Sequence, residues 1–268
     1  MAIPKKIHYC WLSGEKMPRD IVISMNSWKK VMPDYEFVLW DKNRFDIDSV
    51  PWVREWCAIK KWALAADYIR LFAVYTEGGI YLDTDVYALK PFDDFLQYDY
   101  FTGFEYESKT SIFENVVNSD WDDIQRVGEI TFEAAVFGAV KGHPFLRDCM
   151  KWYENHHYEE IYQKIVAPDI YAAVAQKYGF KYKYSAQKLN NNIVILPAGV
   201  FANLNVNIGE ETYAVHWCAG LWKDVNKPSL ANKVKNNSIV RKMFGKEPFL
   251  RIDKRIQAAL KNGKQGNS

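Results

Sequence analysis

The sequence contains no closely spaced cysteine pair and no long apolar run. Its four cysteines are widely separated and include no C-x-x-C pair, which argues against a disulfide framework and against a thiolate zinc site. No stretch approaches the roughly 18 uninterrupted apolar residues of a membrane-spanning helix, and no apolar segment follows the basic N-terminus. We therefore expect free thiols and a cytoplasmic protein.

Internal repeats and low-complexity segments are also absent. The 268 residues are 49% apolar and 25% charged, and the mean hydropathy is −0.32. This composition excludes a disordered chain, a collagen-like chain and an integral membrane bundle. The length is sufficient for a core that needs no disulfides.

The small net charge of +2 conceals an uneven distribution. Residues 223–268 hold 12 Lys and Arg against three acids, a balance of +9, and the remaining chain carries −7. The predicted helix over residues 248–260 has one apolar side and basic residues elsewhere, which is typical of a helix lying on an anionic membrane. A surface helix with solvated lysines has the same pattern, and the sequence leaves both open. We treat residues 223–268 as a basic helical extension of a domain spanning residues 1–222.

The order of the predicted elements indicates an α/β fold. A buried strand over residues 3–11, a helix over 19–31 and a strand over 36–40 form the opening of a parallel sheet. A long helix is predicted over residues 52–77, and a strand over 80–82 follows a Gly-Gly turn. Further strands are predicted at 101–104, 134–140, 193–196 and 213–217, and further helices at 144–153 and 168–178.

Two groups of charged residues break this apolar background. Asp67 and Arg70 are three residues apart on a helix that is apolar nearly all round, so they share one face and are buried. They form either an intrahelical salt bridge or a ligand-binding pair. Asp83 and Asp85 follow the strand over 80–82, and such a strand end is where open α/β sheets bind ligands. Two carboxylates at this spacing suit Mg²⁺ or Mn²⁺.

Three sequence blocks in this order resemble a known enzyme family. They are IPKKIHYCW at 3–11, ADYIRL at 66–71 and GGIYLDTDV at 78–86, and KGHP at 141–144 and HW at 216–217 extend the likeness. The blocks resemble the DXD-containing sugar transferases of glycosyltransferase family 32, which include capsular polysaccharide enzymes and initiating mannosyltransferases. The large glucosylating bacterial toxins have a similar core.

The resemblance implies a GT-A fold, meaning a Rossmann-like nucleotide-sugar-binding mixed sheet flanked by helices. It also implies a metal-dependent retaining hexosyltransferase that uses Mn²⁺ or Mg²⁺. The expected donor is a UDP-hexose, with GDP-mannose second. The expected acceptor is a glycan or a lipid-linked oligosaccharide, as in capsular or surface polysaccharide synthesis. Such an enzyme would be cytoplasmic or peripheral on the inner face of the cell membrane, where residues 246–268 could contact anionic lipid.

The resemblance also assigns residues to the site. The metal ligands are expected to be Asp83, Asp85 and His216. The residues expected to bind the donor are Tyr9, Trp11, Asn43, Asp67, Arg70, Tyr81, Asp83 and Trp222. Trp11 would stack on the base, and Trp222 would close over the donor. The catalytic set is Asp85, Asp83, Arg70 and Glu133, in which Glu133 either stabilises the reacting face or merely caps a strand.

For the reaction we favour front-face substitution, in which the departing phosphate oxygen deprotonates the acceptor hydroxyl. No protein base is then required. His8, inside a strand, is predicted to be structural, and His156 and His157 are predicted to form a solvated helix end.

Two other functions fit parts of the sequence. Haloacid dehalogenase-like phosphatases also place D-x-D after an apolar strand, with the first Asp as nucleophile. Their pattern expects Thr or Val two residues after the second Asp, where this chain has Tyr87. A nucleic-acid-binding protein could use the basic tail, but the body is acidic at −7, so we expect no nucleic-acid partner.

Overall fold

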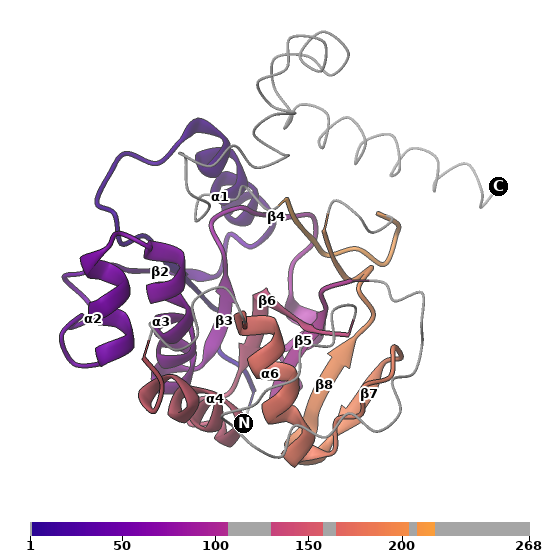
Figure 1. Ribbon diagram of the computed structural model, residues 1–268. Helices are drawn as coiled ribbons and strands as arrows, with labels where there is room; N and C mark the ends of the chain where they lie inside the picture. The colour runs from indigo at the N-terminus through magenta and orange to yellow at the C-terminus, as the bar shows by residue number, and fades with distance from the viewer. Residues whose placement is uncertain (1, 107–129, 158–164, 204–207, 218–268) are drawn as a thin grey trace, which may run out of the picture.

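The computed structural model describes residues 2–106, 130–157, 165–203 and 208–217 (Figure 1). Its helices are α1 (Arg19–Val31), α2 (Pro51–Ala58), α3 (Trp62–Glu77), α4 (Pro144–Glu154) and α6 (Ala167–Ala175). Its strands are β1 (Lys6–Cys10), β2 (Glu36–Trp40), β3 (Gly79–Leu82), β4 (Val86–Ala88), β5 (Tyr100–Phe104), β6 (Phe132–Ala139), β7 (Gln187–Leu189), β8 (Ile193–Leu196), β9 (Phe201–Asn203) and β10 (Ala214–His216).

Seven of the described strands form one mixed sheet in the order β2-β1-β3-β6-β5-β8-β7. β1 runs parallel to both β2 and β3, and β6 runs antiparallel to both β3 and β5. Together β1, α1 and β2 form a β-α-β unit, in which α1 connects two parallel strands. This pairing confirms the predicted fold class, a mixed α/β sheet flanked by helices.

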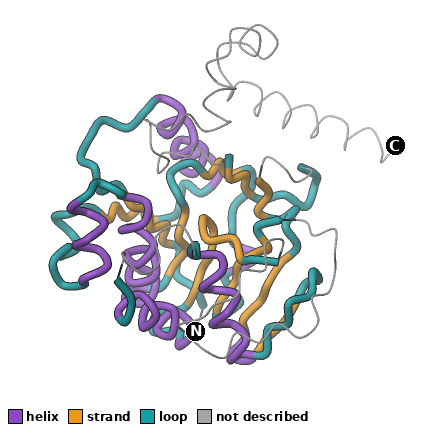
Figure 2. The backbone as a smooth tube through the Cα atoms, viewed as in Figure 1, coloured by secondary structure: helices purple, strands orange, loops and turns teal. Residues whose placement is uncertain are grey.

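The sheet separates two hydrophobic cores. α3 packs against β1 and β3, α6 packs against β6, and α2 and α4 pack against α3 on the same side (Figure 2). Side chains alternate along β3, so Tyr81 joins this core, whereas Ile80 and Leu82 join the core that contains Trp28 of α1. β3 is therefore buried on both faces, which explains its uninterrupted apolar sequence.

The prediction of a single helix over residues 52–77 is wrong. The structure has two helices, α2 and α3, separated by a short turn. Lys60 in this turn has a φ of 59°, in the left-handed region through which a right-handed helix cannot continue. Ile59, an apolar residue within the predicted helix, is 48% exposed. The Trp52 indole joins the two helices by donating to the carbonyl of Leu64 at 2.8 Å.

A second, smaller sheet brings the C-terminal part of the described chain toward the D-x-D segment. β10 lies between β4, to which it is antiparallel, and β9, to which it is parallel. In this register His216 is opposite Val86. The Trp217 indole nitrogen donates to the Ser24 hydroxyl of α1 at 2.9 Å. The strand pairing and the Trp217 contact thereby fix His216 beside the D-x-D motif, although the two are far apart in the sequence.

The histidine predictions have different outcomes. His8 is fully buried; its Nδ1 accepts from the Trp40 indole at 3.0 Å and its Nε2 donates to the Gly78 carbonyl at 2.8 Å. The structural role is confirmed, and burial lowers the pKa of this ring. The prediction for His156 is wrong, because its ring is buried and stacks on Trp152 at 4.3 Å.

Gly79 is expected to be sensitive to substitution because it begins the strand that leads to the D-x-D motif. Its φ is +117°, and an added Cβ would lie 2.9 Å from the Lys6 carbonyl oxygen. Gly79→Ala should therefore destabilise the fold by roughly 1–3 kcal/mol in urea unfolding. Gly14→Ala is the matched control, because Gly14 also has a positive φ but no atom within 4 Å of the added carbon. Equal losses in both variants would contradict the steric argument.

No helix among the described residues is long and apolar enough to cross a membrane. The basic extension over residues 223–268, its predicted helix and the proposed boundary at residue 222 lie outside the described residues. They stay predictions.

Candidate active site

The D-x-D motif forms the turn between β3 and β4. The backbone nitrogen of Asp83 donates to the Ala135 carbonyl of β6, and the nitrogen of Val86 donates to the Asp83 carbonyl, both at 2.9 Å. From α1, the Trp28 indole donates to the Val86 carbonyl at 2.7 Å. The carboxylates are thus held at the end of a buried strand, as predicted, with side chains 26% exposed for Asp83 and 15% exposed for Asp85.

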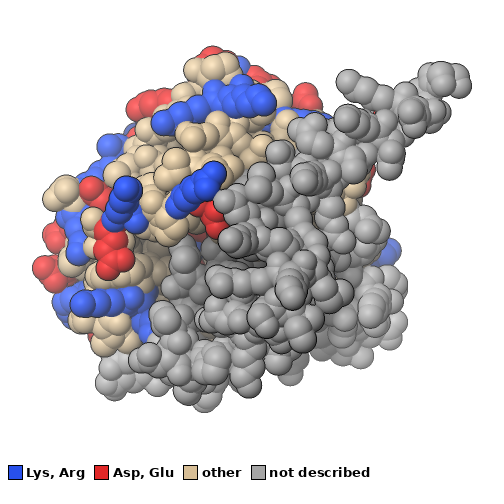
Figure 3. All heavy atoms as spheres, turned by 90° about the horizontal axis from the view of Figure 1, so that it is seen from above, with Lys and Arg blue, Asp and Glu red and all other residues tan. Residues whose placement is uncertain are grey.

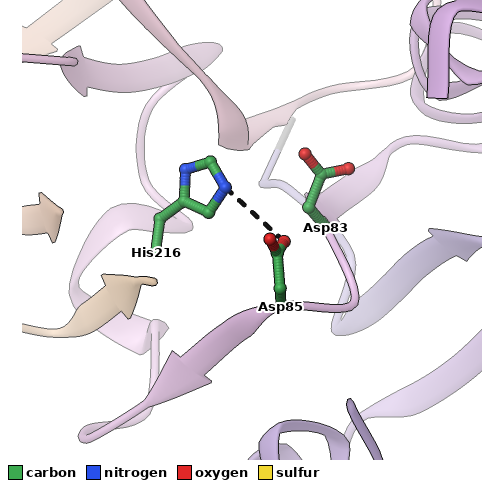
Figure 4. Close-up of side chains that lie close together, drawn as sticks. All are labelled: Asp83, Asp85 and His216. Carbon is green, nitrogen blue, oxygen red and sulfur yellow. Dashed lines mark ion pairs between the residues drawn. The ribbon is translucent and has the colours of Figure 1, made fainter. Parts of the chain in front are cut away.

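The side chains of Asp83 and Asp85 in this turn and of His216 at the end of β10 lie close together (Figure 4). One ligand atom from each lies within 4.8 Å of the others, and Nε2 of His216 is 3.5 Å from Oδ1 of Asp85. Trp217 helps to fix this geometry, since its backbone nitrogen donates to the Asp85 carbonyl at 3.3 Å. Two carboxylates and one imidazole supply three ligand atoms that could hold a divalent cation.

Arg70 of α3 connects the motif to the buried helix. Its guanidinium lies 2.9 Å from Oδ1 of Asp67 and 3.5 Å from Oδ1 of Asp83. It also donates to the Ala134 carbonyl at 3.0 Å and lies 5.0 Å from the centre of the Tyr81 ring. The intrahelical salt bridge weighed for Asp67 and Arg70 is therefore present, and it is part of a larger network that includes Asp83.

The charges of this network do not balance within the protein. Burial raises the pKa of Asp67 to about 7, although Arg70 acts in the opposite direction. Burial also raises the pKa of Asp83. The Tyr81 hydroxyl donates to Asp83 at 2.7 Å. Carboxyl groups outnumber cationic groups here, and an added divalent cation would offset the cost of keeping them ionised.

Glu133 of β6 contacts the ring of His216. It is 1% exposed, and its Oε1 is 3.3 Å from Nδ1 of His216. The same oxygen accepts a hydrogen bond from the backbone nitrogen of Ala135 at 2.8 Å. Glu133 therefore makes two contacts: one with His216 at the site, and one that caps a backbone nitrogen of its own strand.

Three other residues predicted to bind the donor have partners outside the D-x-D motif. Trp11 follows β1, and its indole donates to the Glu15 carbonyl at 2.7 Å. Tyr9 packs edge-on against Trp28. Asn43 lies in an exposed turn, where its side chain donates to Asp41 at 3.3 Å. No contact of these three with the D-x-D carboxylates is found among the described residues, and Trp222 lies outside them.

Glu105, just beyond the end of β5, is a site residue that the sequence analysis did not single out. Burial, and then the charge of Glu133, raises its pKa to about 7. Its carboxylate accepts a hydrogen bond from the Thr131 hydroxyl at 3.1 Å. The available signal was a strand that ends in an acid, the same pattern that drew attention to Asp83.

Glu105 should make stability depend on pH. The folded protein keeps this proton until about pH 7, whereas the unfolded chain releases it near the ordinary glutamate pKa of about 4.3. Stability is therefore lost as the pH rises through this window. Relative to Glu105→Gln, the wild type should lose on the order of 3 kcal/mol between pH 4 and 7.5. Urea unfolding of both proteins across this range measures the difference, and parallel pH profiles would contradict the assignment.

Sequence comparison places the D-x-D segment in a known family. Residues 18–102 match the model of the glycosyltransferase sugar-binding region containing a DXD motif. This segment is similar to the DXD sugar-binding region of glycosyltransferases. The match includes Asp67, Arg70 and both motif aspartates, and confirms the resemblance to the DXD sugar transferases.

Curated relatives show likeness over part of their length. Inositol phosphoceramide mannosyltransferase 3 of Schizosaccharomyces pombe is 30% identical over 165 residues, which cover 59% of this chain and 40% of that protein. The initiation-specific alpha-1,6-mannosyltransferase of Candida albicans is 24% identical over 161 residues, covering 55% of this chain and 41% of that protein. The chain thus spans less than half the length of these relatives.

Solved structures with a partial likeness are also glycosyltransferases. The PaToxG glycosyltransferase has a TM-score of 0.46 and 17% identity, with 66% of this chain and 70% of that chain covered. The galactosyltransferase LgtC, in complex with donor and acceptor sugar analogs, has a TM-score of 0.44 and 14% identity, with 80% and 87% covered. Both TM-scores are below 0.5, so the assignment rests on the sequence match.

The two alternative functions, a phosphatase and a nucleic-acid-binding protein, gain no comparable support. The segment that a phosphatase would use for its D-x-D is the one that matches the DXD sugar-binding region. Lys, Arg, Asp and Glu side chains are interspersed on the described part of the face in Figure 3, which shows no large area of a single sign there. The absence of a nucleic-acid partner stays a prediction.

Proposed function

We propose that this protein is a metal-dependent, retaining glycosyltransferase that moves a hexose from a nucleoside-diphosphate sugar to a glycan or lipid-linked acceptor. The observation that carries the proposal is the convergence of Asp83, Asp85 and His216, because both aspartates lie in the segment that matches the DXD sugar-binding region. The Arg70 network supports the same function, because its ion pair with Asp83 helps to orient one of the two motif carboxylates.

Asp83, Asp85 and His216 would hold Mn²⁺ or Mg²⁺. When bound, the ion supplies positive charge against the leaving diphosphate. In the same proposal Arg70 keeps the Asp83 carboxylate in place through its 3.5 Å ion pair, and Tyr81 orients that carboxylate by its hydrogen bond. The sequence-based expectation that Asp67 and Arg70 bind the donor belongs to this proposal.

The proposed chemistry is substitution on the face from which the diphosphate leaves. The acceptor oxygen forms the new bond to the anomeric carbon as the bond to the phosphate oxygen breaks. That phosphate oxygen takes the acceptor proton, and the anomeric configuration is retained. In this proposal no protein group acts as the general base, because the phosphate oxygen takes the proton.

The proposal also covers the identity of the sugar donor. The sequence-based expectation is a UDP-hexose, with GDP-mannose second. Both relatives described above carry mannosyltransferase names, which favours mannose as the transferred sugar. GDP-mannose therefore has to be tested beside the UDP-sugars.

Thermal unfolding with a panel of nucleoside diphosphates tests the donor site. At a ligand concentration about 100 times Kd, binding adds roughly 2.7 kcal/mol of stability. We expect a shift with UDP or GDP in the presence of Mn²⁺ that disappears with EDTA. Absence of a metal-dependent shift with every nucleotide would contradict the proposed donor site.

Peripheral membrane binding through residues 246–268 belongs to the same proposal and places the enzyme at the cytoplasmic face. Deleting these residues should reduce sedimentation with vesicles that contain anionic lipid, while donor hydrolysis persists. Undiminished sedimentation of the truncated protein would remove the membrane assignment.

A further inference from the structure

Glu133 is buried at the site in a way that its local hydrogen bond does not explain. Its Oε1 accepts from the Ala135 nitrogen, but its Oε2, also buried, has no hydrogen-bond partner among the described residues. A buried carboxylate with one oxygen unsatisfied costs stability. Capping of the Ala135 nitrogen explains one contact of Oε1 and leaves its second contact, with His216, to be explained.

The second contact of Oε1 leads to the proposed metal ligand. Nδ1 of His216 is 3.3 Å from Oε1, while Nε2 on the opposite side of the ring points toward Asp85 (Figure 4). Each ring nitrogen thus faces a carboxylate oxygen, and these oxygens can only accept a hydrogen bond. A cation held by Asp85 takes the lone pair of Nε2, which leaves the ring hydrogen on Nδ1, on the side of Glu133.

We propose that Glu133 is a positioning residue that fixes His216 in the Nδ1–H form and orients Nε2 toward the metal held by Asp83 and Asp85. This inference rests on the proposed function and adds a residue that acts on the metal through His216. Carboxylates that accept from the far nitrogen of a metal-binding histidine commonly have this effect. The rigid β6 backbone supports the assignment, because the Thr102 hydroxyl donates to the Glu133 carbonyl at 2.7 Å.

Two substitutions separate positioning from simple charge. Glu133→Gln keeps the length of the side chain and an acceptor oxygen but removes the charge. Glu133→Asp keeps the charge but withdraws the acceptor by one methylene. If Glu133 positions His216, the Kd for Mn²⁺ should rise about 10- to 100-fold in Glu133→Asp and stay close to the wild-type value in Glu133→Gln. If only its charge mattered, the order would be reversed.

Binding of Mn²⁺ alone to the full chain is measured from the electron paramagnetic resonance signal of the free ion. Glu154→Gln is the matched control, since it makes the same change at a carboxylate whose partners are Arg147 and Tyr68 rather than His216, and its Kd should equal that of the wild type. The reversed order, equal Kd values in all proteins, or equal loss in both Glu133 variants would overturn the positioning role. Failure of the wild type itself to bind Mn²⁺ would instead overturn the metal site of the proposed function.

Discussion

Replacing Asp85 with asparagine should abolish the metal-dependent affinity for nucleoside diphosphate. The Asp85 carboxylate is the group nearest to His216 in the Asp83, Asp85 and His216 cluster. The amide has lost the negative charge that would attract the cation. Since loss of an outer-shell partner of a metal typically costs 10- to 100-fold in affinity, loss of a direct ligand should cost more than about 100-fold. Calorimetric titration of UDP and GDP in Mn²⁺ measures the change.

The chain contains its own control for this experiment. Asp46 and Asp48 form a second D-x-D, but both are exposed, and the Asp48 nitrogen donates to the Asp46 carboxylate at 3.1 Å in a local turn. Asp48→Asn should therefore leave the nucleotide affinity unchanged. Equal behaviour of the two variants would show that the motif between β3 and β4 is not the metal site.

Replacing Arg70 with methionine should strongly destabilise the fold. The Arg70 side chain is 6% exposed and is shared between Asp67 and Asp83. Its removal leaves buried carboxyl groups without their cation, which typically costs 3–5 kcal/mol. Urea unfolding at pH 7.5 should show a loss of about this size, and Asp67→Asn in the same chain should restore part of it.

Arg147→Met is the matched control for the Arg70 variant. Arg147 also forms an ion pair, at 2.6 Å to Glu154, but its side chain is 37% exposed. Exposed pairs contribute about 0–1 kcal/mol, so this variant should be near wild-type stability. A loss for Arg70→Met no larger than that for Arg147→Met would contradict the view that Arg70 neutralises the buried acids.

Elements with a clear period and clear ends were predictable from the sequence. The helix over 19–31 and the strand over 36–40 agree with α1 and β2, because a proline follows the helix and polar residues follow the strand. The break in the expected helix over 52–77 was not predictable. The apolar period continues through Ile59, whereas the left-handed conformation of Lys60 depends on how α2 packs against α3.

The site was predictable where its residues are close in sequence. Asp67 and Arg70 share a helix face, and Asp83 and Asp85 share a turn, so their spacing identified them. The contact between Glu133 and His216 depends on β10 pairing with β4 beside the main sheet, and no local pattern encodes that pairing. His216 was predicted from the family resemblance, whereas Glu105, which is partly buried and interacts with Glu133, was not predicted.

The most direct test of the central claim is release of nucleoside diphosphate from GDP-mannose and from UDP-hexoses by the full chain, in Mn²⁺ and in EDTA. We expect one donor to be consumed in Mn²⁺, with loss of that turnover in EDTA and in Asp85→Asn. Turnover that is equal in EDTA, or equal in Asp85→Asn, would contradict a metal-dependent transferase site at Asp83, Asp85 and His216. So would the absence of turnover with every donor, with or without added glycan acceptors.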